Sequence, residues 1–202
     1  MSKLLYKGEF MNKTKRKIFE TSMRLFAEKG YDATSIEEIT ATVGVAKGTL
    51  YYHFSSKDEI FNFLVEEGMK LLKNSIEIKT SKFDNVIDKI RAIILIQIKV
   101  LAKYEHIITI ILNQFLGSEA RNLSCQAFVI DYIKTIEDII LEGMHKKEIP
   151  NGDAKIIAST IFSLTYSMLV YKLQNDNSLP IQELYKKYQD IIINGLLNAG
   201  NN

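Results

Sequence analysis

The stretch Ile36–Phe54 reads IEEITATVGVAKGTLYYHF, and its pattern decides how the first part of the chain folds. Ile36, Ile39 and Val43 recur at helical spacing, which predicts a short helix with one apolar face. Gly44 follows where a tight turn needs a strained or left-handed backbone, and glycine adopts that conformation at the lowest cost. The first half of the stretch therefore predicts a short helix that ends in a glycine turn.

The second half of the stretch predicts another short helix, whose outward face is unusual. Leu50 and Phe54, four residues apart, supply a small inward face. The side chains left outside include hydrogen-bond donors and flat rings and no acid: Lys47, Gly48, Thr49, Tyr51, Tyr52 and His53. The second helix of a helix-turn-helix lies in the major groove of DNA, and these groups suit phosphates and base edges. The pattern therefore predicts DNA binding by these six residues.

With its flanks, the segment from Ile18 to Lys57 resembles the DNA-binding domain of the tetracycline-repressor (TetR) family. The positions that carry the resemblance are Ile18, Leu25, Phe26, Gly30, Thr34, Ile36, Ile39, Gly44, Val45, Lys47, Gly48, Thr49, Leu50, Tyr51, Phe54, Lys57 and Leu64. Ala46 departs from the family, which usually has a serine there, and a missing side-chain cap costs about 1 kcal/mol. The resemblance covers roughly the first third of the chain and implies a DNA-binding transcriptional regulator, in most cases a repressor.

Two further places in this segment are predicted to hold DNA phosphates. Thr34-x-x-Glu37 reads as a capping box that opens the first short helix, and Ser35 with Glu38 is an equally placed alternative. Either hydroxyl lies at a helix N-terminus, where backbone N–H groups attract a phosphate. Lys57, at the start of the next helix, is the other predicted phosphate contact.

Composition limits what the rest of the chain can be. Its 202 residues are 47 % apolar with only two prolines, which predicts an all-α fold with a substantial core. Residues 1–57 carry ten Lys/Arg and six Asp/Glu, whereas residues 58–202 carry sixteen and eighteen, so the basic excess lies with the predicted DNA-binding segment. Taken alone, an excess of this size is more typical of ordinary solvated charge.

The cysteine content and the N-terminus predict a cytoplasmic protein. One cysteine, Cys125, excludes an internal disulfide and fits a reducing compartment. The first residues lack the apolar run of a signal peptide, and Met1 and Met11 both fit as a natural start.

Periodicity and capping signals predict about nine helices. Besides the two short helices, they span about 12–29, 57–79, 83–103, 105–116, 118–147, 153–174 and 180–200. The predicted domains are a helix-turn-helix domain over 11–57 and a helical ligand-binding and dimerisation domain over 58–202. The resemblance implies that the helix at 57–79 acts as a lever between them.

The uncharged run Ile156–Tyr171 raises the question of a membrane span. It is shorter than the ~20 residues that cross a bilayer and holds several hydroxyl side chains, so a buried helix is favoured. Ser159, Ser163 and Ser167 lie four residues apart on one stripe, which lets another helix approach closely. Packing within one subunit would explain the stripe, whereas the resemblance implies a homodimer through the last two helices, bound to a palindromic operator.

No arrangement of residues predicts an enzyme, a metal or a cofactor. His53, His106 and His145 are the only histidines, and no two of them have helical metal-ligand spacing. Glu142-x-x-His145 occurs once, whereas di-iron bundles need two such motifs and further glutamates.

The C-terminal part combines apolar bulk with polar or polarisable side chains in apolar settings, namely Gln97, Asn113, Gln114, Tyr132, Tyr166 and Met168. A cavity with a few converging polar groups is typical of a small-molecule site, and a small hydrophobic inducer is the expected ligand. For each residue alone, ordinary packing or exposure is the stronger alternative. Two rival functions stay open: an all-α small-molecule-binding protein or enzyme with a vestigial helix-turn-helix, and a constitutive DNA binder without an inducer.

Overall fold

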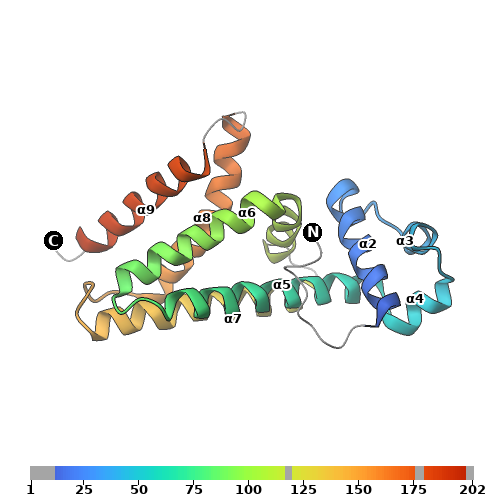
Figure 1. Cartoon of the computed structure of the whole chain (residues 1–202), viewed down its shortest axis with the longest axis horizontal. Coiled ribbons are helices and arrows are strands. Elements are labelled where there is room, and N and C mark those ends of the chain that lie inside the picture. Colours follow the sequence, from blue (N-terminus) through green and yellow to red (C-terminus); the bar gives the residue numbers. More distant parts are fainter. Residues whose placement is uncertain (1–11, 117–119, 176–179, 199–202) are drawn as a thin grey trace. The chain divides into compact units, whose positions relative to one another are not determined.

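The computed structural model describes residues 12–116, 120–175 and 180–198, and all regular secondary structure in these ranges is α-helical (Figure 1). The helices are α2 (Lys13–Lys29), α3 (Ile36–Val43), α4 (Lys47–His53), α5 (Lys57–Thr80), α6 (Val86–Leu116), α7 (Ala120–His145), α8 (Ala154–Gln174) and α9 (Ile181–Asn198). The predicted all-α fold is confirmed.

The main difference from the predicted helices lies at Tyr104. The helices predicted at 83–103 and 105–116 form one element, α6, in which Tyr104 has φ −128° and ψ 30°, outside the helical region. The predicted boundary is therefore present as a kink within a continuous element. Neither proline nor glycine stands at this point, although these residues cause most kinks.

The chain divides into two compact units. The first comprises Met1–Leu71 and His106–Phe128, and the second comprises Leu72–Glu105 and Val129–Asn202. Helices α5, α6 and α7 each contribute residues to both units. The predicted boundary between residues 57 and 58 separates functions and not compact units, and it stays a prediction.

In the first unit, α2, α3 and α4 lie side by side (Figure 1). The aromatic rings of Phe19 and Phe63 meet edge to face at 5.2 Å, which ties α2 to α5. Of the apolar residues predicted to face inward, Ile39, Val43, Leu50 and Phe54 are buried, whereas Ile36 is only half-buried. Ile18, Leu25 and Phe26 of α2 are buried as well. Each such side chain contributes about 1.5–3 kcal/mol through its removal from water, and together they fix the position of α4.

Glycine turns separate the helices of this unit as the sequence predicted. Gly44 has φ 78° and ψ 40°, the left-handed conformation, and its N–H donates to the carbonyl of Thr40. Gly30, at φ 88°, ends α2 in the same way by donating to Phe26. Any other residue at Gly44 would be strained by its backbone, although there is space for a Cβ atom.

In the second unit, the start of α6 packs closely against the end of α7. A Cβ atom added to Gly143 would lie 2.6–2.7 Å from the buried side chain of Val86, so only glycine fits there. The N–H of Val86 donates to the carboxylate of Glu148, and Lys89 pairs with Glu142 at 2.7 Å. These contacts hold the two helix ends together.

Helix α8 is buried along one side only. Within the described ranges, Ala154–Lys172 is the one stretch long and apolar enough to cross a membrane by length and composition, and 33 % of that window is buried. Core helices of soluble proteins pass the same test. The prediction of a buried helix therefore needs a correction, because Ile156, Ser163 and Tyr166 lie on an exposed side.

Candidate nucleic-acid interface

Helix α4 exposes Lys47, Gly48, Tyr51 and Tyr52, whereas Thr49 and His53 are half-buried. Leu50 is its one buried residue, whereas the side chains of Tyr51 and Tyr52 are 50 % and 83 % exposed. The ring of Tyr52 meets the ring of His53 edge to face at 5.0 Å, and a Cβ atom at Gly48 would find open space. The predicted outward face thus presents two exposed tyrosine rings at the surface of the first unit.

The start of α4 confirms the expected missing cap. Ala46 makes no side-chain hydrogen bond, and its carbonyl accepts from the N–H groups of Thr49 at 3.0 Å and Leu50 at 3.3 Å. The helix ends where the N–H of Phe54 donates to the carbonyl of Leu50 at 2.8 Å. Buried Leu50 and Phe54 hold this short helix in place where local capping does not.

Lys47, the first residue of α4, pairs with Glu37 in the first turn of α3. Both side chains are more than half exposed, at 54 % and 63 %. The hydrogen bond with Glu37 raises the pKa of Lys47, and the same bond lowers the pKa of Glu37. Sequence reasoning missed Glu37 as part of this surface, because a pair between two helices has no fixed sequence spacing.

The structure decides between the two candidate caps of α3. Ser35 is the N-cap, and its hydroxyl oxygen accepts from the N–H of Glu38 at 3.1 Å. Thr34 is buried, and its hydroxyl donates to the carbonyl of Gly30 at 2.8 Å, so the capping box from Thr34 to Glu37 was wrong. Of the two predicted phosphate contacts, only Ser35 lies exposed at the N-terminus of the helix.

Lys57 has acceptors within the protein. Its ammonium donates to the carbonyls of Tyr31 at 2.8 Å, Thr34 at 2.9 Å and Asp32 at 3.5 Å, and lies 4.3 Å from the centre of the Tyr31 ring. The hydroxyl of Tyr31 also donates to the carboxylate of Asp58. Lys57 therefore fastens the loop between α2 and α3 to the start of α5, a role that sequence reasoning missed.

Two lysines of α2 also contact other elements of the first unit. The ammonium of Lys15 lies 4.9 Å from the ring centre of Phe54 and 5.1 Å from that of Phe63. The ammonium of Lys17 donates to the carbonyl of Val43 at 3.2 Å, at the C-terminal end of α3. Much of the positive charge near α4 thus also stabilises the fold.

In the second unit, the structure joins two of the predicted ligand-binding residues. The amide nitrogen of Gln97 on α6 donates to the hydroxyl of Tyr132 on α7 at 3.0 Å, and both side chains are buried. Burial raises the pKa of Tyr132, so the phenol stays protonated. The amide oxygen of Gln97 is buried without a partner among the described residues. Buried polar atoms without a partner are rare, and a bound water or ligand would satisfy this one.

The other predicted ligand-binding residues are placed differently. Met168 is fully buried, whereas Tyr166 is 52 % exposed on α8. The side chains of Asn113 and Gln114 lie outside the described part of the chain. The structure therefore links only Gln97 and Tyr132 by a described contact.

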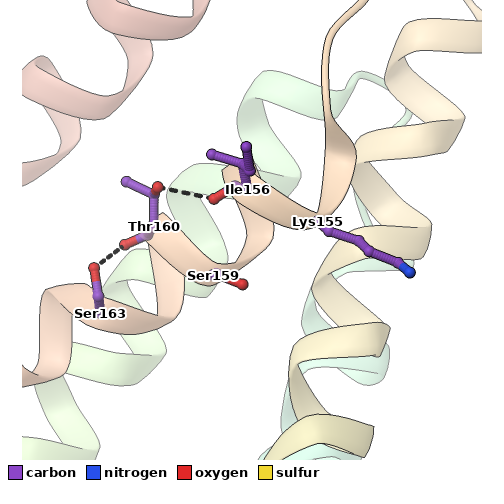
Figure 2. A pocket seen from close by; sticks show the side chains of 5 residues that line it. All are labelled: Lys155, Ile156, Ser159, Thr160 and Ser163. Carbon is purple, nitrogen blue, oxygen red and sulfur yellow. Dashed lines mark hydrogen bonds between the residues drawn. The ribbon is translucent and has the colours of Figure 1, made fainter.

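A shallow hollow follows the exposed side of α8 and is lined by Lys155, Ile156, Ser159, Thr160 and Ser163. Figure 2 shows the hydroxyl of Thr160 donating to the carbonyl of Ile156, and that of Ser163 to the carbonyl of Thr160, both at 2.8 Å. The hydroxyls of Thr160 and Ser163 are thus satisfied by their own helix.

Known proteins resemble both the first unit and the whole fold. Residues 18–64 match the family described as bacterial regulatory proteins, tetR family. The negative transcriptional regulator IcaR of the biofilm operon of Staphylococcus aureus (strain Newman) is 39 % identical over 74 residues, which are 37 % of this chain and 40 % of that protein. The chain spans two fifths or less of the length of the first curated relatives it matches.

Two solved structures share the fold over nearly their whole length. A Clostridium perfringens protein proposed to regulate fatty acid metabolism superposes with a TM-score of 0.81 at 29 % identity, covering 89 % of this chain and 98 % of that one. FadR from Bacillus subtilis, solved with stearoyl-CoA, gives 0.80 at 21 % identity, covering 90 % and 98 %.

Proposed function

We propose that this chain, whose residues 18–64 belong to the tetR family of bacterial regulatory proteins, is a transcriptional regulator that binds DNA through α4. It would act by repressing transcription, since its relative IcaR is named a negative transcriptional regulator. The activity of the relatives as regulators argues for this function and against an enzyme.

The observation that carries the proposal is the outward face of α4. This seven-residue helix exposes two tyrosines and a lysine, and the side chain of Tyr52 is 83 % exposed. Placed in a major groove, Tyr52 and Thr49 reach base edges, Ser35 meets a phosphate, and Lys47 reaches a base acceptor or a phosphate. Base contacts specify the sequence, and phosphate contacts position the helix.

The proposed assembly is a homodimer through α8 and α9. The exposed side of α8 carries Ile156 and Val170 beside small, internally bonded hydroxyl residues, and α9 exposes Ile191. A second copy of the same surface would cover these apolar groups, and two-fold symmetry suits a palindromic operator. Introducing Arg at Ser163 would place an unpaired charge in this interface and should yield a monomer in light scattering.

The proposed ligand site centres on Gln97 and Tyr132. Their buried polar pair leaves an amide oxygen unsatisfied within apolar surroundings, which suits a largely hydrophobic ligand with one hydrogen-bonding group. FadR, with the same fold, was solved with stearoyl-CoA, and a fatty acyl ligand fits this description. The ligand would release DNA only if it bound the DNA-competent state less tightly, so operator DNA must weaken its binding by the same factor.

Footprinting on the DNA upstream of the gene for this protein tests the function. We expect a protected inverted repeat, and Tyr52→Ala should reduce the preference for that operator over random DNA by about tenfold or more, because a good base contact contributes about 1–3 kcal/mol. Phe83→Ala, which removes an exposed ring outside the first unit, is the control and should bind as the parent does. Equal preference in parent and Tyr52→Ala would contradict the role of α4.

A further inference from the structure

We propose that Glu37 is a specificity-determining residue, whose carboxylate occupies the ammonium of Lys47 and so weakens binding to DNA other than the operator. The inference rests on the proposed function. It gives a role to a negatively charged residue within the proposed DNA-binding surface.

Lys47 is well placed to control how α4 attracts phosphate. It is the only lysine or arginine in α4, whose sequence is KGTLYYH. Tyr51 follows four residues later, so the ammonium lies on the same side of the helix as one of the exposed rings. A partner of Lys47 therefore acts on the surface that would face the groove.

Glu37 is the observed partner and belongs to a different helix. It stands in the first turn of α3, where the helix dipole favours a negative charge whether or not Lys47 is present. The buried residues Ile39 and Leu50 fix α3 and α4 within the same unit, so the two side chains are held within reach of each other. The shift of both pKa values in the direction of the charged forms agrees with this pairing.

The two kinds of DNA differ in what they offer Lys47. Binding to random DNA is almost entirely electrostatic, so a lysine neutralised by an adjacent carboxylate contributes little to it. An exposed ion pair is weak, and operator DNA that presents base acceptors to Lys47 can exchange it. Glu37 should therefore penalise random DNA more than the operator.

The experiment measures binding of the full chain to a random-sequence duplex and to the footprinted operator over a series of salt concentrations. Glu37→Gln should raise affinity for the random duplex about two- to fivefold, the range in which exposed ion pairs act, and should raise operator affinity less. Its log–log salt slope on random DNA should steepen by about 0.9, the value for one additional phosphate. In the Lys47→Met background, Glu37→Gln should change neither quantity.

Glu28→Gln is the matched control, because it removes the same charge from an equally exposed ion pair, that of Arg24 in α2. An equal gain in Glu28→Gln would mean that net charge alone acts, and would overturn the inference. An effect of Glu37→Gln that persists in Lys47→Met would overturn it as well. Binding by the parent with no change in Glu37→Gln contradicts this inference alone, whereas no binding of duplex DNA by any variant contradicts the proposed function itself.

Discussion

Replacing Lys57 by methionine tests whether this residue holds the loop between α2 and α3. Methionine keeps most of the length and apolar stem of lysine but removes the ammonium, which donates to the carbonyls of Tyr31 at 2.8 Å and Thr34 at 2.9 Å. Hydrogen bonds from a charged donor contribute about 1.5–3 kcal/mol each. Because the site is only partly buried, we expect Lys57→Met to lower the free energy of unfolding by about 2–4 kcal/mol.

Urea denaturation followed by the circular dichroism of the helices measures this loss. Lys70→Met is the matched control, since Lys70 lies in the same helix and forms exposed pairs with Glu66 and Glu67. Such pairs contribute less than about 1 kcal/mol, so the control should stay close to the parent. If Lys57→Met is as stable as Lys70→Met and only its DNA binding falls, Lys57 is a phosphate contact and the loop-fastening role is refuted.

Three other predictions follow from packing in the chain. Gly143→Ala should destabilise the protein by about 1–3 kcal/mol, because its methyl group would overlap Val86. Gly195→Ala in α9, whose methyl group would meet open space, should leave the stability equal or raise it by up to about 1 kcal/mol. Thermal unfolding of the two variants compares these effects. Gln97→Met should destabilise the protein, because it leaves the hydroxyl of Tyr132 unpaired. Adding Tyr132→Phe should recover most of the lost stability in the same unfolding measurement. If the two substitutions instead cause additive losses, the buried polar pair is contradicted. Burial raises the pKa of Cys125 to about 11. At neutral pH its thiol should therefore react with a thiol reagent far more slowly in the native protein than in urea. Equal rates would show that Cys125 is accessible in the native protein.

The sequence predicted the first unit well because its signals are local. Apolar spacing placed Ile39 and Leu50 inward, and Gly44 predicted a turn with a left-handed or strained backbone, which the structure shows as left-handed. The choice between Thr34 and Ser35 as the cap was not local, because it depends on which hydroxyl the folded loop buries. Patterns repeated within one helix were therefore readable, whereas choices made by the tertiary fold were not.

The roles of charged residues were the part that sequence alone could not predict. Glu37 and Lys47 meet across two helices, and Lys57 reaches carbonyls more than twenty residues earlier in the chain. No periodicity marks such contacts, and a lysine near a helix-turn-helix fits a phosphate contact as well as a structural one. The buried pair of Gln97 and Tyr132, which joins α6 to α7, could be named as polar residues in apolar settings but not as partners.

The central claim is that α4 reads DNA sequence, and selection from a random pool of duplex DNA tests it most directly. The parent protein is mixed with the pool, and the bound DNA is recovered over several rounds. We expect this DNA to be enriched in an inverted repeat whose half-site centres lie about one helical turn of DNA apart, or somewhat further apart on the same face. Tyr52→Ala should bind the pool but enrich that repeat weakly or not at all. A parent that enriches no sequence, or a Tyr52→Ala variant that enriches the same repeat equally, would contradict the claim.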